Sequence, residues 1–361
     1  MADLAQAQAL VDRYPGQTAF RELLAAELVG GANRDRRARR YDAAATGFRR
    51  AITLRPGDAT LRLALADLLR EAGDWPGVEA AAREALSLAP TNPDVLEMLA
   101  FALFRQDRNR EALDAVKTAI DIRPSPSALA LRARIEKGFR DENGMTEQRL
   151  AHFDVRYDGE AHADIGREIL RALERHYATL ARAFDHEPGT TIPVILFTSQ
   201  AYYDASGAPA WSGGEFDQTD GRIRIPVLGV TTALNSDMDS TLIHELTHAF
   251  INDMTRGVAP PNLHEGVAQY MEGKRVASML QPSEIAALAD GRIRGVAGYY
   301  LGALSFTEYL YGMRGQGGIN DVLKAMGETG NVDESFRRVY GQDFQSTQQA
   351  WSDRLKQVYG G

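Results

Sequence analysis

The first 140 residues carry a hydrophobic pattern that recurs at a fixed interval. Residues 51–56, 85–90 and 119–124 are copies of one phrase, in which two aliphatic residues precede a proline, and the prolines are 34 residues apart. Because proline cannot continue a helix, each interval is predicted to be a helical unit that ends at its proline. Small residues recur at equivalent positions, which lets paired helices approach closely: Ala32, Ala66, Ala100, Ala44, Val78 and Ala112.

This period resembles the tetratricopeptide (TPR) arrays over residues 23–124, with residues 2–14 and 127–139 as flanking or capping helices. The resemblance implies an all-α TPR solenoid over residues 1–140, whose concave groove binds a peptide or a protein partner. No residue identifies that ligand. The basic run at residues 34–40 is interpreted as a solvated helix end, with an acidic partner as the alternative.

The period changes beyond residue 150. An amphipathic helix is predicted at residues 165–184. Three strands are predicted at residues 152–157, 192–197 and 222–227. Pro226 confines the last strand to a sheet edge. An α+β domain is therefore expected over residues 151–361, after a polar, turn-rich linker at residues 141–150.

The end of the chain reads as helices separated by turns. Glycines concentrate at residues 312–318, which predicts a loose turn or connector. The closing helices are expected at residues 319–326, 332–340 and 346–358.

The segment with the clearest chemistry is TLIHELTHAF, residues 241–250. His244, Glu245 and His248 form the pattern HExxH. On a helix, two histidines four apart project from one face, so both imidazoles can reach a single Zn²⁺ beside Glu245, a candidate base. The competing interpretation is a helix that carries these polar residues on its solvated side.

A second element follows in residues 260–271, PPNLHEGVAQYM. The two prolines begin a new helix, and Val267, Ala268 and Met271 give it an apolar side for packing on the first. A catalytic zinc site uses three protein ligands and leaves one position for water, whereas a structural site uses four. Glu265 is therefore expected to be the third ligand of a catalytic site.

HELTHAF followed by HEGVAQYME resembles the gluzincin metallopeptidases, and more narrowly the bacterial peptidase MA-like domains. The resemblance implies a zincin-like metallopeptidase domain over residues 151–361. In it His244, His248 and Glu265 bind zinc, and Glu245 activates a water molecule.

The resemblance also implies a donor for the developing oxyanion, downstream of the third ligand. Tyr300 is the expected donor, Tyr299 and His264 are alternatives, and a core tyrosine is the competing interpretation. Family members often carry a tryptophan and an asparagine just before the ligand glutamate, where this chain has Leu263 and His264. This departure leaves the pocket wall undefined.

Two further roles are expected around the zinc helix. Gln269 and Glu272 share a helix face with the third ligand and are expected to orient a ligand histidine, the alternative being a solvated face. An edge strand beside a zinc site can pair with an extended peptide, so Ile223, Arg224 and Ile225 are expected to bind substrate. A hairpin that only completes the sheet is the alternative.

Composition removes several classes of function. The chain has 41 basic and 49 acidic residues, a net charge of −8, and no recognisable nucleic-acid-binding module, so nucleic acid is not expected as a partner. With no cysteine, disulfides and thiolate metal ligands are excluded. No long apolar run predicts a membrane span. A cytoplasmic location is expected, or export if a leader was removed.

Two functions remain. The first is a zinc-dependent peptidase that hydrolyses peptide bonds in protein or peptide substrates, with the TPR array recruiting the substrate or a partner. The second is a non-catalytic TPR interaction protein whose peptidase-like half binds without cutting. The first is favoured because every expected ligand and the base are present. Endopeptidase and aminopeptidase activity are not distinguished, and the substrate, the TPR ligand and the oligomeric state stay open.

Overall fold

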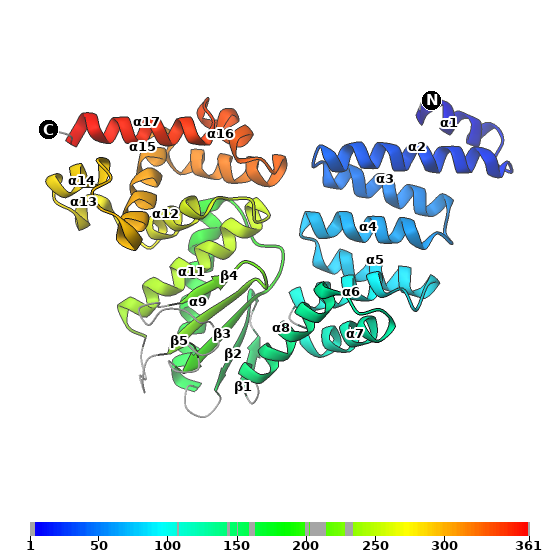
Figure 1. Ribbon diagram of the computed structural model, residues 1–361, viewed down its shortest axis with the longest axis horizontal. Helices are drawn as coiled ribbons and strands as arrows, with labels where there is room; N and C mark the ends of the chain where they lie inside the picture. Colours follow the sequence, from blue (N-terminus) through cyan, green and yellow to red (C-terminus); the bar gives the residue numbers. More distant parts are fainter. Residues whose placement is uncertain are drawn as a thin grey trace. The chain divides into compact units, whose positions relative to one another are not determined.

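The chain forms two compact units, Met1–Asp141 and Glu142–Gly361 (Figure 1). The structure, a computed structural model, describes residues 4–106, 108–142, 145–149, 151–158, 163–198, 202, 214–227 and 234–359. No described helix combines the length and the apolar composition needed to cross a membrane.

The first unit is a stack of antiparallel helix pairs, which confirms the predicted helical array. Its helices are α1 (Leu4–Arg13), α2 (Thr18–Arg37), α3 (Tyr41–Leu54), α4 (Ala59–Ala72), α5 (Trp75–Leu88), α6 (Pro93–Arg105), α7 (Asn109–Ile122) and α8 (Pro126–Glu142). All six small residues of the repeat pattern are buried. At Gly47 an added Cβ would lie 3.0 Å from the Cβ of Ala32, so α2 and α3 pack as closely as the small residues predict.

Polar residues set the ends of these helices. Asp58, Asp74 and Asn92 cap α4, α5 and α6, each accepting hydrogen bonds from backbone N–H groups of the first turn. Gly73 ends α4 with a φ of 77°, a left-handed conformation that favours glycine. The repeat therefore contains its own start and stop signals.

The basic run at the end of α2 is partly structural. The Arg36 guanidinium makes ion pairs with Asp67 and Glu71 of α4, and its Nε donates to Glu71 at 3.0 Å. Arg40 pairs with Asp35 of its own turn. The interpretation of this run as a solvated helix end is therefore wrong for Arg36, which holds the first repeat against the second.

The second unit contains a mixed sheet in the order β1-β2-β3-β5-β4. Its strands are β1 (Met145–Arg149), β2 (Phe153–Asp158), β3 (Ile192–Thr198), β4 (Glu215–Asp217) and β5 (Arg222–Val227). β2, β3 and β5 run parallel, and β1 and β4 pair antiparallel at the two edges. The long helix α9 (Ala163–Phe184) connects β2 to β3, as a parallel pair requires.

Alternating residues of the three central strands divide between the two faces of the sheet. One set packs with α9 and with α11 (Ser236–Thr255) in the main core: Phe153, Val155, Tyr157, Val194, Leu196, Ile223, Ile225 and Val227. Ile195 and Phe197 point to the other face and pack with Tyr202. One face of the sheet thus supports the helix that carries the HExxH pattern.

Two predictions about this sheet are wrong. Residues 145–149 lie in the expected linker, but they form β1, which pairs with β2 over its whole length. Residues 222–227 are not an edge strand, because β4 pairs along residues 222–224 of β5 and takes the outer position itself. Pro226 is accommodated because it lies beyond the three residues that pair with β4.

The remaining helices follow α11 in sequence: α12 (Pro261–Met271), α13 (Val276–Met279), α14 (Pro282–Ala289), α15 (Gly295–Thr329), α16 (Val332–Tyr340) and α17 (Phe344–Tyr359). The turn predicted within residues 312–318 is confirmed at Gly315, whose backbone (φ 63°, ψ −162°) is not helical, although the residues on either side of it belong to helical parts of α15. Buried residues on both sides of the kink, Leu310 and Ile319 among them, keep the two halves in one core.

Candidate metal centre

Helix α11 carries His244, Glu245 and His248 across the core of the second unit. Its buried residues, which include Leu242, Leu246 and Phe250, anchor it against the sheet and α9. Asn235 caps its first turn by accepting from the Met238 N–H at 2.8 Å.

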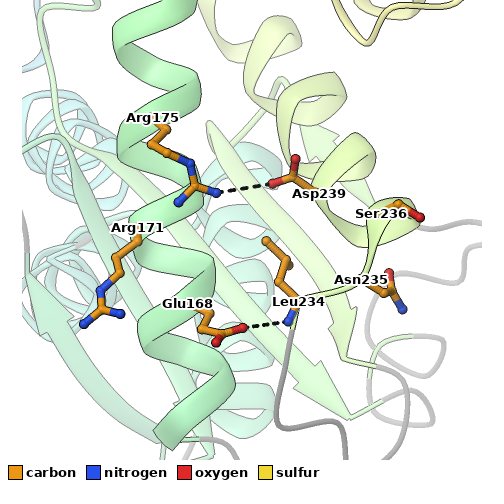
Figure 2. A pocket seen from close by; sticks show the side chains of 7 residues that line it. All are labelled: Glu168, Arg171, Arg175, Leu234, Asn235, Ser236 and Asp239. Atoms are coloured by element: carbon orange, nitrogen blue, oxygen red, sulfur yellow. Dashed lines mark hydrogen bonds and ion pairs between the residues drawn. The ribbon is translucent and has the colours of Figure 1, made fainter.

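The first end of α11 is tied to α9, and its last end is tied to the segment that follows α9. His176 Nε2 lies 2.9 Å from Asp239 Oδ1 near the first end, and His186 Nε2 lies 2.7 Å from Asp253 Oδ2 near the last. A cavity of about 440 Å³ lies beside the first end (Figure 2). There Arg175 pairs with Asp239, and Glu168 accepts from the Leu234 N–H at 2.7 Å. These contacts fix where α11 begins.

Helix α12 presents Glu265 to α11. It begins at Pro261, and Leu263 and Val267 are fully buried in the main core, as the predicted apolar side requires. At Gly266 an added Cβ would lie 2.2 Å from both the carbonyl oxygen of Ala303 and Oγ1 of Thr307. Only glycine allows α12 to approach α15 this closely, and the approach sets the position of the neighbouring Glu265.

His244, His248 and Glu265 lie close enough together to hold one metal ion. The distance from His244 Nε2 to Glu265 Oε2 is 3.5 Å, and that from His248 Nε2 to Glu265 Oε1 is 3.6 Å. The three ligand atoms lie within 4.8 Å of one another. Both distances exceed the usual hydrogen-bond range. The two distances, which end on different oxygens of Glu265, are close to the separation of about 3.4 Å between ligand atoms around a tetrahedral zinc with bonds of about 2.0–2.1 Å.

The surroundings of the three residues favour a cation. Glu265 Oε2 is buried and has no hydrogen-bond partner among the described residues. Burial opposes protonation of His244, but the nearby carboxylates of Glu265 and Glu272 outweigh it and raise its pKa to about 10. Burial and the charges of His244 and His264 hold the pKa of His248 well below its usual value. The residues therefore fit a divalent ion with nitrogen and oxygen ligands, such as zinc.

Glu245 lies beside these residues and is only 7% exposed. Its burial raises its pKa to about 7, an effect that the nearby charge of His244 opposes. The backbone N–H of Phe216 in β4 donates a hydrogen bond to its carboxylate. A carboxylate with a pKa near neutrality is suited to accept and return a proton.

The edge strand β4 (Glu215–Asp217) lies beside α11. Gly214, directly before it, would place an added Cβ 2.9 Å from Thr241 Cγ2 and 3.1 Å from Glu245 Cγ. The glycine therefore lets the edge strand approach α11. The glycine pair at residues 213–214 was a usable signal, because glycine beside a strand often marks close backbone approach.

Residues 223–225 do not form the expected substrate surface. Ile223 and Ile225 are fully buried in the main core. Arg224 makes ion pairs with Asp220 and Asp217. Since β4 covers this side of β5, the outer strand nearest Glu245 is β4 itself.

Of the two residues expected to orient a ligand histidine, one contacts a histidine and the other does not. Glu272 does contact one, with Oε2 lying 3.1 Å from His244 Nδ1. Gln269 does not, since its amide donates to the carbonyl oxygens of Glu265 at 3.2 Å and Tyr300 at 2.9 Å. It joins α12 to the first turns of α15 instead.

The three candidate oxyanion donors all lie near the site. Burial and the charge of Glu265 raise the pKa of Tyr300 to about 12, and they raise that of Tyr299 as well. The His264 ring lies 5.5 Å from the His248 ring, and burial lowers its pKa to about 4. The backbone carbonyl of Tyr300 is anchored to α12 through the Gln269 side chain, and His264 is part of α12 itself.

The comparisons with known proteins concern the first unit. The family profile described as tetratricopeptide repeat matches residues 69–135, which cover α5 to α7 and parts of the neighbouring helices. The N-terminal half therefore contains a TPR repeat within its helical array, and this supports a role in protein–protein interaction. A comparison with curated protein sequences found no match.

Proposed function

We propose that the second unit is a zincin-like, zinc-dependent peptidase and that the TPR array recruits its substrate or a protein partner. The observation that carries the proposal is the convergence of His244, His248 and Glu265, with unpaired or poorly paired ligand atoms turned toward one another. These atoms come from two helices, so their meeting does not follow from helical spacing alone.

The three residues would hold the ion, and the other groups would carry the proton steps. Zinc bound there would polarise a scissile carbonyl and acidify a water molecule. Glu245 would accept the proton of the attacking water and deliver it to the nitrogen of the leaving amine. The Tyr300 hydroxyl would donate a hydrogen bond to the carbonyl oxygen as negative charge develops on it. Tyr299 and His264 are the alternative donors.

An extended substrate would bind along β4 rather than β5. Ile223 and Ile225 of β5 are buried and are not available to a substrate, so β4 is the strand that a peptide could reach. The Phe216 N–H of β4 donates to the Glu245 carboxylate. Because Gly214 allows this close approach, a peptide paired with β4 would have its carbonyl near the base. Peptide or protein is therefore the substrate class that the arrangement supports.

The TPR array offers a separate binding surface. A cavity of about 610 Å³ lies on the first helices of successive repeats, with Met98, Phe101 and Leu131 as apolar lining and Arg70 and Glu97 as polar lining. It falls within the matched repeat region, so it is the part of the array proposed to bind a peptide segment of the substrate or partner. This cavity also favours the second candidate function, a TPR interaction protein whose other half does not cut.

One substitution separates the two functions. Glu245→Gln removes the proton acceptor but keeps the size of the side chain. It is expected to reduce cleavage of a peptide library by about 10²–10⁴-fold while zinc content is unchanged. Glu187→Gln, at an exposed glutamate, is the matched control and should cleave like the wild type. Wild-type protein that binds zinc but cuts no member of the library would support the interaction protein instead.

A further inference from the structure

The His244 imidazole is held between two carboxylates of the α12 region, one at each ring nitrogen. Nε2 faces Glu265 Oε2 at 3.5 Å, and Nδ1 lies 3.1 Å from Glu272 Oε2. Glu272 is seven residues after Glu265 and so lies on the same helix face two turns away. A proton on Nδ1 donated to Glu272 leaves the Nε2 lone pair for the metal side.

Glu272 is itself oriented by a second residue. Its side chain is only 10% exposed, and Lys274 Nζ lies 2.9 Å from its Oε1. Oε1 is therefore paired with the lysine, and Oε2 with the imidazole. A nearly buried carboxylate needs partners for both oxygens, because an unpaired one loses its hydration without compensation.

A defined turn places Lys274 in this position. Gly273 has a φ of 95°, its N–H donates to the Tyr270 carbonyl oxygen, and the Lys274 N–H donates to that of Gln269 at 3.0 Å. This is the hydrogen-bond pattern of a Schellman cap. Arg275 reinforces it, with its guanidinium 3.5 Å from the centroid of the Tyr270 ring and Nη1 donating to the Tyr270 carbonyl oxygen at 2.9 Å.

We propose that Lys274 is a positioning residue of the metal centre: by holding Oε1 of Glu272, it keeps Oε2 on His244 Nδ1 and so aims His244 Nε2 at the metal position. The inference rests on the proposed zinc site. The alternative for Lys274 is an exposed surface ion pair without effect on the metal, since its side chain is 43% exposed.

Zinc affinity of the full chain, measured by competition with a chromophoric chelator, tests this role without relying on activity. Glu272→Gln is expected to weaken zinc binding by about 10–100-fold, the usual effect of losing a partner of a ligand histidine. Lys274→Met should weaken it by a smaller factor, about 3–10-fold, because the histidine contact survives but is less fixed. Lys274→Arg should restore affinity to within about twofold of the wild type, since the charge and the donors are kept.

The controls separate positioning from folding. Lys324→Met, at an exposed lysine of α15 without an ion-pair partner among the described residues, should leave zinc affinity unchanged. Thermal unfolding of the metal-free variants is measured alongside, with Lys274→Gln as a second variant. A purely structural lysine would lower that unfolding temperature and leave zinc affinity unaltered.

The outcomes also distinguish this inference from the proposal beneath it. If the wild type binds no zinc, the metal centre itself is refuted. If the wild type binds zinc and Lys274→Met binds it equally well, only the positioning role of Lys274 is overturned. In the zinc-loaded wild type, ¹⁵N NMR should detect a protonated Nδ1 on His244, and faster exchange of this proton with solvent in Glu272→Gln would support the same chain of contacts.

Discussion

Replacing Gly266 by alanine should force α12 away from α15. The added Cβ would lie 2.2 Å from the Ala303 carbonyl oxygen and from Thr307 Oγ1, whereas ordinary contacts begin at 3.4 Å. Thr307 can rotate, but the backbone carbonyl of Ala303 cannot, so the helices must separate by about 1 Å. Overpacking of this kind costs about 3 kcal/mol, at the upper end of the usual range. The helix propensity of alanine offsets about 1 kcal/mol of it, which leaves a net loss of about 2 kcal/mol.

Gly312→Ala is the matched control because the same substitution there should raise the free energy of unfolding instead of lowering it. Gly312 is also helical and exposed, and its added Cβ would meet no atom within 4 Å. Alanine should therefore stabilise the protein by up to about 1 kcal/mol. Urea denaturation of the wild type and both variants measures the two free energies of unfolding.

The effect of Gly266→Ala should extend to the metal centre. Glu265 is its neighbour on α12, so displacement of the helix moves the proposed third ligand, and zinc affinity should fall by about tenfold or more. The reasoning is refuted if Gly266→Ala is as stable as Gly312→Ala. Lost stability with full zinc affinity would show that the packing of α12 and the position of Glu265 are independent.

Three further predictions concern the oxyanion donor, the array and the ion. Tyr300→Phe should lower kcat by about 10²–10³-fold with unchanged zinc affinity; an unaltered kcat would exclude Tyr300 as the oxyanion donor. Arg36→Met should destabilise the TPR array by about 1 kcal/mol at pH 7, measured by urea denaturation. Burial raises the pKa of Asp67, but hydrogen bonds from Arg70 and Arg36 lower it overall. The stabilisation by the Asp67 carboxylate is thus complete above the pKa of about 4 that Asp67 has in the unfolded chain, and it is lost as the pH falls through the pKa of Asp67 in the folded protein. In acid, the free energies of unfolding of the wild type and Arg36→Met should therefore become equal. Removing zinc with a chelator should lower the unfolding free energy by about 4 kcal/mol relative to zinc at 1,000 times its Kd, and equal stabilities would contradict specific binding.

Local spacing was enough to predict the core of the candidate site. Two histidines four apart need only a helix to share a face, and α11 is that helix. Glu265 could be anticipated because Pro260 and Pro261 begin a new helix with an apolar side, which must pack back on the core. The TPR array could also be predicted from the sequence, because a 34-residue period repeats the same contacts between helices.

What sequence could not supply were contacts that depend on how helices cross or how short strands pair. Gln269 and Glu272 lie on one face of the α12 region, but only the crossing of α11 and α12 decides that Glu272 meets His244. β4 is three residues long, too short for a detectable alternation, so the edge position was assigned to β5. At Gly312 to Gly318 composition favoured a turn, and the backbone does break at Gly315, but sequence could not show that the residues on both sides continue as helix and pack in one core.

The most direct test of the account is the zinc stoichiometry and affinity of the purified full chain, with and without Glu265. Elemental analysis of the wild type, together with chelator competition, should give one zinc per chain. Glu265→Gln should bind zinc at least about 100-fold more weakly, because an amide oxygen carries no charge for the ion. A wild type without stoichiometric zinc, or a Glu265→Gln variant that binds zinc as tightly as the wild type, would contradict the proposed metal centre.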